Sequence, residues 1–280
     1  MKKLLLFSAL LPLSVHAALI ECWTFNDVPA GPVAGNGTIV SFGVNGLPAV
    51  IRGAGVTSTG SAIDLPGGSS VTQGYIDLPN GIISARTDAT FETWLTIDSI
   101  RNWQRVFDFG SNTNGEQTGP GGAGTGNDYI IIAANRGTNA NQQRIEAIDN
   151  GVGMGAIDSN VTIPLGTQHL FTFVWDDLGP NNSTQSWYLN GNLVISQTTG
   201  LNMNLNDISD VNNWLGRSNW GGDENTDGTY NQFAIYDTAF SPAEVAASFA
   251  VGPTSHIPEP SVNLVLAGSL LGLMIRRRRA

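Results

Sequence analysis

The sequence predicts an all-β fold, an antiparallel sandwich or barrel, with one short helix near the end of the domain. Asn-Gly pairs, which favour tight turns between antiparallel strands, recur at residues 36–37, 45–46, 80–81, 150–151 and 190–191. Between these turns lie short segments rich in β-branched and aromatic residues, as strands require.

The expected strands show the alternation that a half-buried sheet produces. In the segment 91–97, Phe91, Leu95 and Ile97 share one face, and Glu92 and Trp94 share the other. In chain order, we expect strands at 20–25, 38–42, 61–65, 75–78, 91–97, 105–109, 129–134, 143–149, 168–175, 186–189, 192–197, 214–216 and 231–236.

Turns and one capping motif connect these strands. Pro66-Gly67-Gly68 predicts a turn, and the Gly-, Asn- and Thr-rich stretch 111–127 predicts a long mobile loop. Asn190-Gly191 closes the clearest hairpin. Ser241-Pro242-Ala243-Glu244 is a capping box with proline at the first helical position, and it predicts a helix to about Phe249.

Residues 1–17 have the pattern of a secretory signal peptide. A basic start, Lys2-Lys3, precedes the apolar run 4–15, and small residues at the expected cleavage site end at Ala17. Cys22 follows closely, but the glutamate before it does not fit a lipoprotein motif. We therefore expect Cys22 to be a buried, apolar residue of the first strand.

The end of the sequence combines three features in a fixed order. Pro258-Glu259-Pro260 precedes the apolar run 262–275, and an arginine cluster follows that run. This arrangement resembles the PEP-CTERM sorting signal of Gram-negative bacteria. The resemblance implies export, transient anchoring in the inner membrane, and cleavage by an exosortase at Pro258, Glu259 and Pro260. The released protein would then reach the cell surface or the extracellular matrix.

The apolar run itself is short for a permanent membrane anchor. Its 14 residues would span roughly 21 Å as a helix, against a bilayer core of ~30 Å. We expect a short transmembrane helix that is held only until cleavage, within a sorting signal at 257–280 that follows a linker at 251–256. A buried terminal helix with a solvated basic tip is the alternative. The stop-transfer residues would be Arg276, Arg277, Arg278 and Arg279.

Removal of both ends leaves an acidic chain of about 240 residues, enough for one sandwich-sized domain or two small ones. Residues 18–258 contain seven arginines, no lysine and 22 acidic residues, for a formal charge of −15. Such a charge argues against nucleic acid or anionic lipid as a partner. It favours cations, neutral glycans or a basic protein, or it serves only to keep a secreted protein soluble.

Several stretches in this order resemble the laminin-G-like, concanavalin A-like jelly-roll superfamily. The resemblance covers residues 18–250 and implies two packed antiparallel sheets. It also implies a role in glycan binding, protein binding or structure, without choosing among them. The stretches that carry it are 23–26, 91–95, 103–110, 169–176, 187–191, 215–218, 228–236 and 240–244.

Asp223, Asn225 and Asp227 are the candidate metal ligands. Oxygen donors at alternate positions before Gly228 are typical of loops that bind calcium. An EF-hand is excluded, because Ala234 stands where that motif needs a glutamate. These residues are therefore a candidate calcium site, and a solvated acidic turn is the competing interpretation.

Exposed aromatic residues are the candidate glycan platform, because the apolar face of a sugar stacks on a ring. The strongest candidate is Trp220, which lies beside the acidic stretch. Burial in the core is the alternative for each candidate. The candidates are Trp103, Trp214, Trp220 and Tyr230.

The sequence does not predict an enzyme. The paired acidic residues on one strand that laminarinase-type enzymes of this fold carry are absent, and His169 is the one histidine between leader and linker. We expect an exported, non-catalytic protein of the cell surface or exopolysaccharide matrix that binds a glycan or a protein. The alternatives are a secreted glycoside hydrolase with carboxylates on separate loops, and a purely structural matrix protein.

Overall fold

The computed structural model of the protein describes residues 18–180, 182–199 and 203–253. The predicted signal peptide (1–17) and sorting signal (257–280) lie outside these residues. Within the part of the chain that the structure describes, no helix has the length and apolar character needed to cross a membrane.

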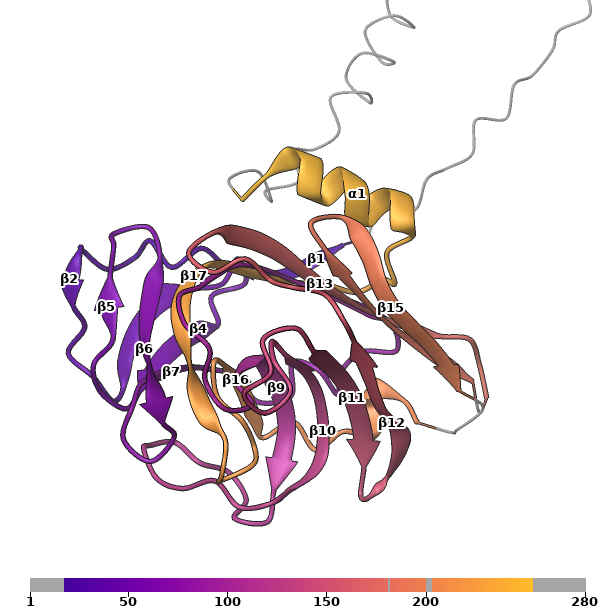
Figure 1. The fold of residues 1–280 in the computed structure, drawn as a ribbon, viewed down its shortest axis with the longest axis horizontal. Coiled ribbons are helices and arrows are strands. Elements are labelled where there is room, and N and C mark those ends of the chain that lie inside the picture. The colour runs from indigo at the N-terminus through magenta and orange to yellow at the C-terminus, as the bar shows by residue number, and fades with distance from the viewer. Residues whose placement is uncertain (1–17, 181, 200–202, 254–280) are drawn as a thin grey trace, which may run out of the picture.

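Two antiparallel sheets stack face to face, so the protein is a sandwich (Figure 1). The nine-stranded sheet has the order β15-β14-β13-β8-β17-β6-β5-β2, with β1 also paired to β17. Its strands are β1 (Leu19–Trp23), β2 (Gly31–Pro32), β5 (Thr57–Ser58), β6 (Ile63–Ser69), β8 (Ala89–Ile97), β13 (Gln168–Asp177), β14 (Ser183–Leu189), β15 (Asn192–Thr199) and β17 (Glu224–Tyr236).

The eight-stranded sheet has the order β12-β11-β10-β9-β16-β7-β4-β3. A one-turn 3₁₀ helix, η1 (Leu205–Asp207), precedes β16, and the helix α1 (Pro242–Val251) ends the domain. The strands of this sheet are β3 (Thr38–Phe42), β4 (Pro48–Arg52), β7 (Tyr75–Leu78), β9 (Arg105–Asn112), β10 (Gly126–Ala133), β11 (Gln143–Asp149), β12 (Val152–Ser159) and β16 (Asn212–Leu215).

A cluster of phenylalanines fills the space between the sheets. Phe91 and Phe173 come from the nine-stranded sheet, and Phe107 and Phe109 come from the eight-stranded sheet. The rings of Phe91 and Phe107 meet edge to face with centroids 5.8 Å apart, and those of Phe107 and Phe109 stack at 4.5 Å. The alternation predicted for the segment 91–97 is confirmed, because Phe91, Leu95 and Ile97 are all in this core.

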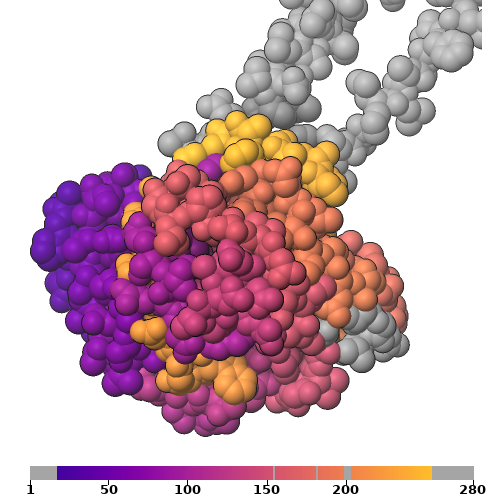
Figure 2. Space-filling model, in the orientation of Figure 1, coloured from indigo at the N-terminus to yellow at the C-terminus, as the bar shows by residue number. Residues whose placement is uncertain are grey.

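Helix α1 covers the outer face of the nine-stranded sheet (Figure 1) and forms a ridge on the surface of the domain (Figure 2). The predicted capping box at Ser241 is confirmed. The helix is held by the ring of Phe249, which stacks on Trp94 at 5.8 Å, and by Ser248, whose hydroxyl donates to the buried carboxylate of Glu92 (2.7 Å). The helix therefore occupies part of the outer face of this sheet.

The hairpin predicted at Asn190-Gly191 is also confirmed. It joins β14 to β15, and both residues have the positive φ (51° and 78°) that a two-residue turn of this kind requires.

The turn predicted at Pro66-Gly67-Gly68 is wrong, since these residues lie inside strand β6 and pair with β17. Gly67 is needed there for two reasons. It has a positive φ of 67°, and a Cβ atom at this position would lie 2.6 Å from the Cβ of Asp227. Glycine thus allows two strands to approach closely here instead of reversing the chain.

Candidate ligand-binding site

A pocket of about 320 Å³ opens on the outer face of the eight-stranded sheet. Alternation along two strands creates it: Ile130 and Ile145 point into the core, and their neighbours point into the pocket. The lining residues are Trp103, Arg105, Tyr129, Ile131, Arg144, Glu146, Trp220 and Asp223.

The loop from Gly216 to Asp223 folds over this face and forms one rim. Its first residues are buried, and Trp220, at 36% exposure, stands at the pocket edge. The indole packs edge to face on Tyr129 with ring centroids 6.3 Å apart. It also lies against Gly126, where an added Cβ would be 2.5 Å from the indole nitrogen. Only glycine at position 126 therefore leaves room for this placement of Trp220.

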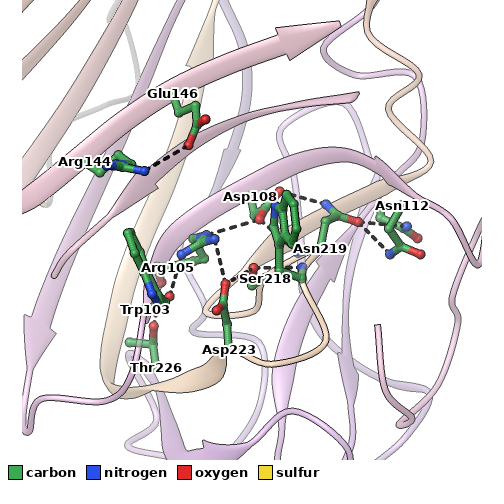
Figure 3. A network of polar contacts seen from close by, with 12 residues as sticks. Trp103, Arg105, Asp108, Asn112, Arg144, Glu146, Ser218, Asn219, Asp223 and Thr226 are labelled. Atoms are coloured by element: carbon green, nitrogen blue, oxygen red, sulfur yellow. Dashed lines mark hydrogen bonds and ion pairs between the residues drawn. The ribbon is translucent and has the colours of Figure 1, made fainter. Parts of the chain in front are cut away.

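Arg105 is the buried cation beneath the pocket, and each of its guanidinium nitrogens has a protein partner (Figure 3). Nη2 donates to Asp223 (2.8 Å), Nη1 donates to the main-chain oxygen of Trp103 (2.6 Å), and Nε donates to Asp108 (3.3 Å). These bonds fix the stretch 103–108 and Asp223 around one point.

Asp108 connects this arginine to the loop that carries Trp220. Its carboxylate is fully buried and accepts from the main-chain N (2.9 Å) and the Nδ2 (2.8 Å) of Asn219. Asn112 and Asn212 in turn donate to the Oδ1 of Asn219 (2.9 and 3.1 Å). The loop is therefore anchored to strands β9 and β16 by buried hydrogen bonds (Figure 3).

Trp103 and Arg144 form the opposite side of the pocket. The guanidinium carbon of Arg144 lies 5.1 Å from the centre of the Trp103 ring, a cation–π contact. Two hydrogen bonds to Asp158 (2.7 and 3.1 Å) hold Arg144, and its Nη1 lies 3.8 Å from the carboxylate of Glu146.

Burial raises the pKa of the acidic groups around the pocket. For Glu146 and Asp223, desolvation is the largest cause, and it is opposed by nearby arginines. Desolvation also raises the pKa of Asp108, with Arg105 opposing. By contrast, the hydrogen bond to Asp158 raises the pKa of Arg144, so that this side chain stays charged.

A model of the concanavalin A-like lectin/glucanases superfamily, in its Laminin_G_3 form, matches residues 69–246. The chain belongs to this superfamily. The predicted concanavalin A-like jelly roll is thereby confirmed. No curated protein matches the chain.

Solved structures of low identity share the fold of this superfamily member. Domain 4 of AbnA, a GH43 extracellular arabinanase from Geobacillus stearothermophilus, was solved with arabinotriose. It is 17% identical, with a TM-score of 0.55 over 82% of this chain and 98% of that one. The CBM40 of the Ruminococcus gnavus IT-sialidase, bound to α2,3-sialyllactose, is 17% identical, with a TM-score of 0.52 over 67% and 96%. The receptor-binding domain of botulinum neurotoxin type G is 14% identical, with a TM-score of 0.54 over 83% and 51%.

The aromatic residues predicted as a glycan platform separate into two groups in this concanavalin A-like domain. Trp103 and Trp220, 117 positions apart in the sequence, line the same pocket. The prediction for Tyr230 is wrong, because it is fully buried and its hydroxyl donates to the main-chain oxygens of Arg105 (3.2 Å) and Val106 (2.7 Å). Trp214 is fully buried as well. Neither can offer a ring to a ligand.

The stretch 223–227 is not the loop that the calcium prediction assumed, because β17 begins at Glu224. Side chains four residues apart on a strand are separated by about 13 Å, too far for one ion. Asp223 pairs with Arg105, and Asp227 pairs with Arg101 (2.7 Å). Among the described residues, no group of three or more His, Cys, Asp or Glu could hold a metal ion. Calcium binding by the protein stays a prediction, to be checked by thermal unfolding with calcium and with a chelator.

Most of the polar pocket residues were not predicted from the sequence. Arg144 and Glu146 alternate with Ile145 and Ala147, and this pattern identifies them as facing away from the core. The pattern gives no sign that Arg105 or the loop at Trp220 would approach the same face.

Proposed function

We propose that this protein is an exported, non-catalytic jelly-roll protein that binds a glycan in the pocket between Trp103 and Trp220. The supporting observation is that two tryptophan rings and polar groups of both charges line one pocket. Sugars present an apolar face that packs on aromatic rings and hydroxyls that donate and accept hydrogen bonds, so this composition suits them. The glycan-bound relatives of the same fold add support.

A glycan array with the purified protein tests this function. Retention of intact glycans supports binding, and loss of the signal in Trp220→Ala and Trp103→Ala assigns it to the pocket. Leu193→Ala serves as a control, because this side chain is 54% exposed on β15, in the other sheet. If no glycan on the array is retained, a purely structural role in the matrix would be the better proposal.

A glycoside hydrolase is the second candidate, and one observation favours it. Two carboxyl groups with raised pKa, Glu146 and Asp223, line the same pocket, and glycosidases use such a pair. Binding without cleavage is preferred because Asp223 is already bonded to Arg105 (2.8 Å) and to the hydroxyl of Ser218 (2.7 Å). Appearance of shortened glycans on incubation, abolished in Glu146→Gln, would establish the hydrolase instead.

The route to the cell surface is part of the same proposal. The leader at 1–17 and the Pro258-Glu259-Pro260 tail support export and cleavage by an exosortase, with release to the surface or matrix. Mass spectrometry of the protein recovered from the culture medium or matrix should find a C-terminus between Pro258 and Pro260. Recovery with Arg276–Arg279 intact would overturn this route.

A further inference from the structure

Two polar groups of the pocket, Nη1 of Arg144 and the carboxylate of Glu146, make only a long ion pair with each other (3.8 Å). Each of the three guanidinium nitrogens of Arg105 donates a hydrogen bond to the protein. The carboxylate of Asp223 accepts hydrogen bonds from Arg105 and Ser218. Arg144 uses Nε and Nη2 for Asp158. What remains is Nη1 of Arg144 and the carboxylate of Glu146.

Glu146 is incompletely satisfied by its surroundings. Its side chain is 16% exposed, and its contact with Arg144 at 3.8 Å is too long for a hydrogen bond. Within residues 18–180, 182–199 and 203–253, no hydrogen bond reaches this carboxylate. A pair of donors on a ligand would therefore form charge-assisted hydrogen bonds with this carboxylate.

The charge around the pocket indicates the chemistry of that donor pair. Each guanidinium at the pocket is matched by an aspartate within 3.3 Å, whereas Glu146 has no guanidinium within hydrogen-bond distance. An anionic ligand would therefore meet the carboxylate of Glu146, whose ion pair with Arg144 (3.8 Å) is the longest of those at the pocket. A neutral sugar with two adjacent hydroxyls fits better, since both can donate to one carboxylate while Arg144 donates to a sugar oxygen.

The size of the pocket limits how much of a glycan can enter. Its volume of about 320 Å³ is at the lower end of the ~300–1,000 Å³ range of small-molecule sites. It suits one or two sugar rings, and Trp103 and Trp220 both line it. We propose, building on the glycan-binding function above, that the pocket selects a neutral sugar with a vicinal diol and that Glu146 and Arg144 are its specificity-determining residues.

Calorimetry with named probes tests this selection. The wild-type protein should bind at least one of arabinotriose, mannotriose and galactotriose at least ten-fold more tightly than trigalacturonate or sialyllactose. Glu146→Gln keeps the shape of the side chain but removes its charge. This variant should bind the neutral sugar at least ten-fold more weakly, and the difference between its affinities for neutral and anionic sugars should become smaller. Glu116→Gln, at an exposed loop residue, is the matched control.

The outcomes separate this inference from the proposed function. If the wild type prefers an anionic sugar, or if Glu146→Gln binds a neutral one unchanged, the diol assignment is overturned and glycan binding stands. If the wild type binds no glycan on the array or in solution, the proposed glycan binding and the diol assignment are both wrong. A 2-deoxy analogue of the bound sugar that competes as well as the parent would also overturn the diol assignment.

Discussion

The carboxylate of Asp108 in β9 accepts two hydrogen bonds from Asn219, although 111 positions separate the residues in the sequence. The same carboxylate accepts from Arg105, so it holds both the floor of the pocket and the loop that carries Trp220. We expect Asp108→Asn to destabilise the fold by about 2–4 kcal/mol, because a buried arginine loses one of its two charge partners and an amide donor then faces other donors.

Urea unfolding and glycan binding of the same sample measure the effect of Asp108→Asn. Affinity should fall along with stability, since the loop bearing Trp220 loses its anchor. Glu116→Gln provides the comparison for an exposed acidic residue. A stability change below about 0.5 kcal/mol would show that Asp108 does not have this role.

Gly126→Ala should move Trp220 more than it disturbs the fold. The new Cβ would lie 2.5 and 2.9 Å from two atoms of the indole, so the partly exposed ring must shift. We expect at least a ten-fold loss of glycan affinity, with a smaller loss of stability. Gly122→Ala is the matched control, because a Cβ there meets nothing within 4 Å. Equal affinities for the two variants would contradict the placement of Trp220.

Arg217 fixes the loop 113–125 from within. Its guanidinium carbon lies 4.4 Å from the ring centres of both Tyr75 and Trp214, and it donates to the carbonyl oxygens of Gly119 (3.4 Å) and Gly121 (2.5 Å). Arg217→Met keeps most of the side-chain volume but loses these interactions. It should lower the free energy of unfolding by about 2–3 kcal/mol.

Limited proteolysis with Glu-C checks this effect, because Glu116 lies in the loop. Cleavage at Glu116 should become several-fold faster in Arg217→Met under conditions where most molecules stay folded. Arg217→Lys keeps the charge but cannot stack a planar group on the two rings. Its cleavage rate at Glu116 should lie between those of the wild type and Arg217→Met. Cleavage at the wild-type rate in both variants would contradict the role of Arg217 in holding the loop.

Asp128 should make stability depend on pH in an unusual direction. The side chain is 2% exposed, its Oδ2 accepts from the main-chain N of Ser209 (2.5 Å), and its Oδ1 has no hydrogen-bond partner. Burial, followed by the charges of Asp149, Asp210 and Asp207, raises its pKa to about 6. The folded protein thus binds a proton at Asp128 more tightly than the unfolded chain does. The stability that this proton adds is fully present below about pH 4 and is lost as the pH rises through 6.

Asp128→Asn should remove this dependence and stabilise the protein at pH 7.5 by about 2 kcal/mol. The amide keeps an acceptor for Ser209 and places a donor among acidic neighbours. Chemical unfolding at a series of pH values measures both proteins. If their stabilities stay a constant distance apart from pH 4 to pH 7.5, Asp128 is not the group responsible.

Sequence patterns predicted the strands better than they predicted the site. Alternation in 91–97 and the turn at Asn190-Gly191 depend on neighbours a few residues away, and both are confirmed. The turn predicted at Gly67 was wrong because Pro-Gly-Gly usually indicates a turn. Here the glycine instead allows close contact with Asp227, which lies 160 positions later in the sequence.

The pocket required information that local patterns do not contain. Trp220 and Tyr230 lie ten positions apart in similar polar surroundings, yet one forms the rim and the other is fully buried. The difference arises because the loop before β17 turns back over β9, where Asp108 holds it. Local patterns also give no sign that Trp103 and Trp220 line the same pocket.

The position of α1 sets the orientation in which the domain would meet its surroundings. Near the end of the described chain, the helix lies on the outer face of the nine-stranded sheet (Figure 1). The pocket opens on the outer face of the other sheet. The described chain therefore ends on the side away from the pocket. If the domain were held by that end, the pocket would face outward, and attachment and glycan binding would use different surfaces.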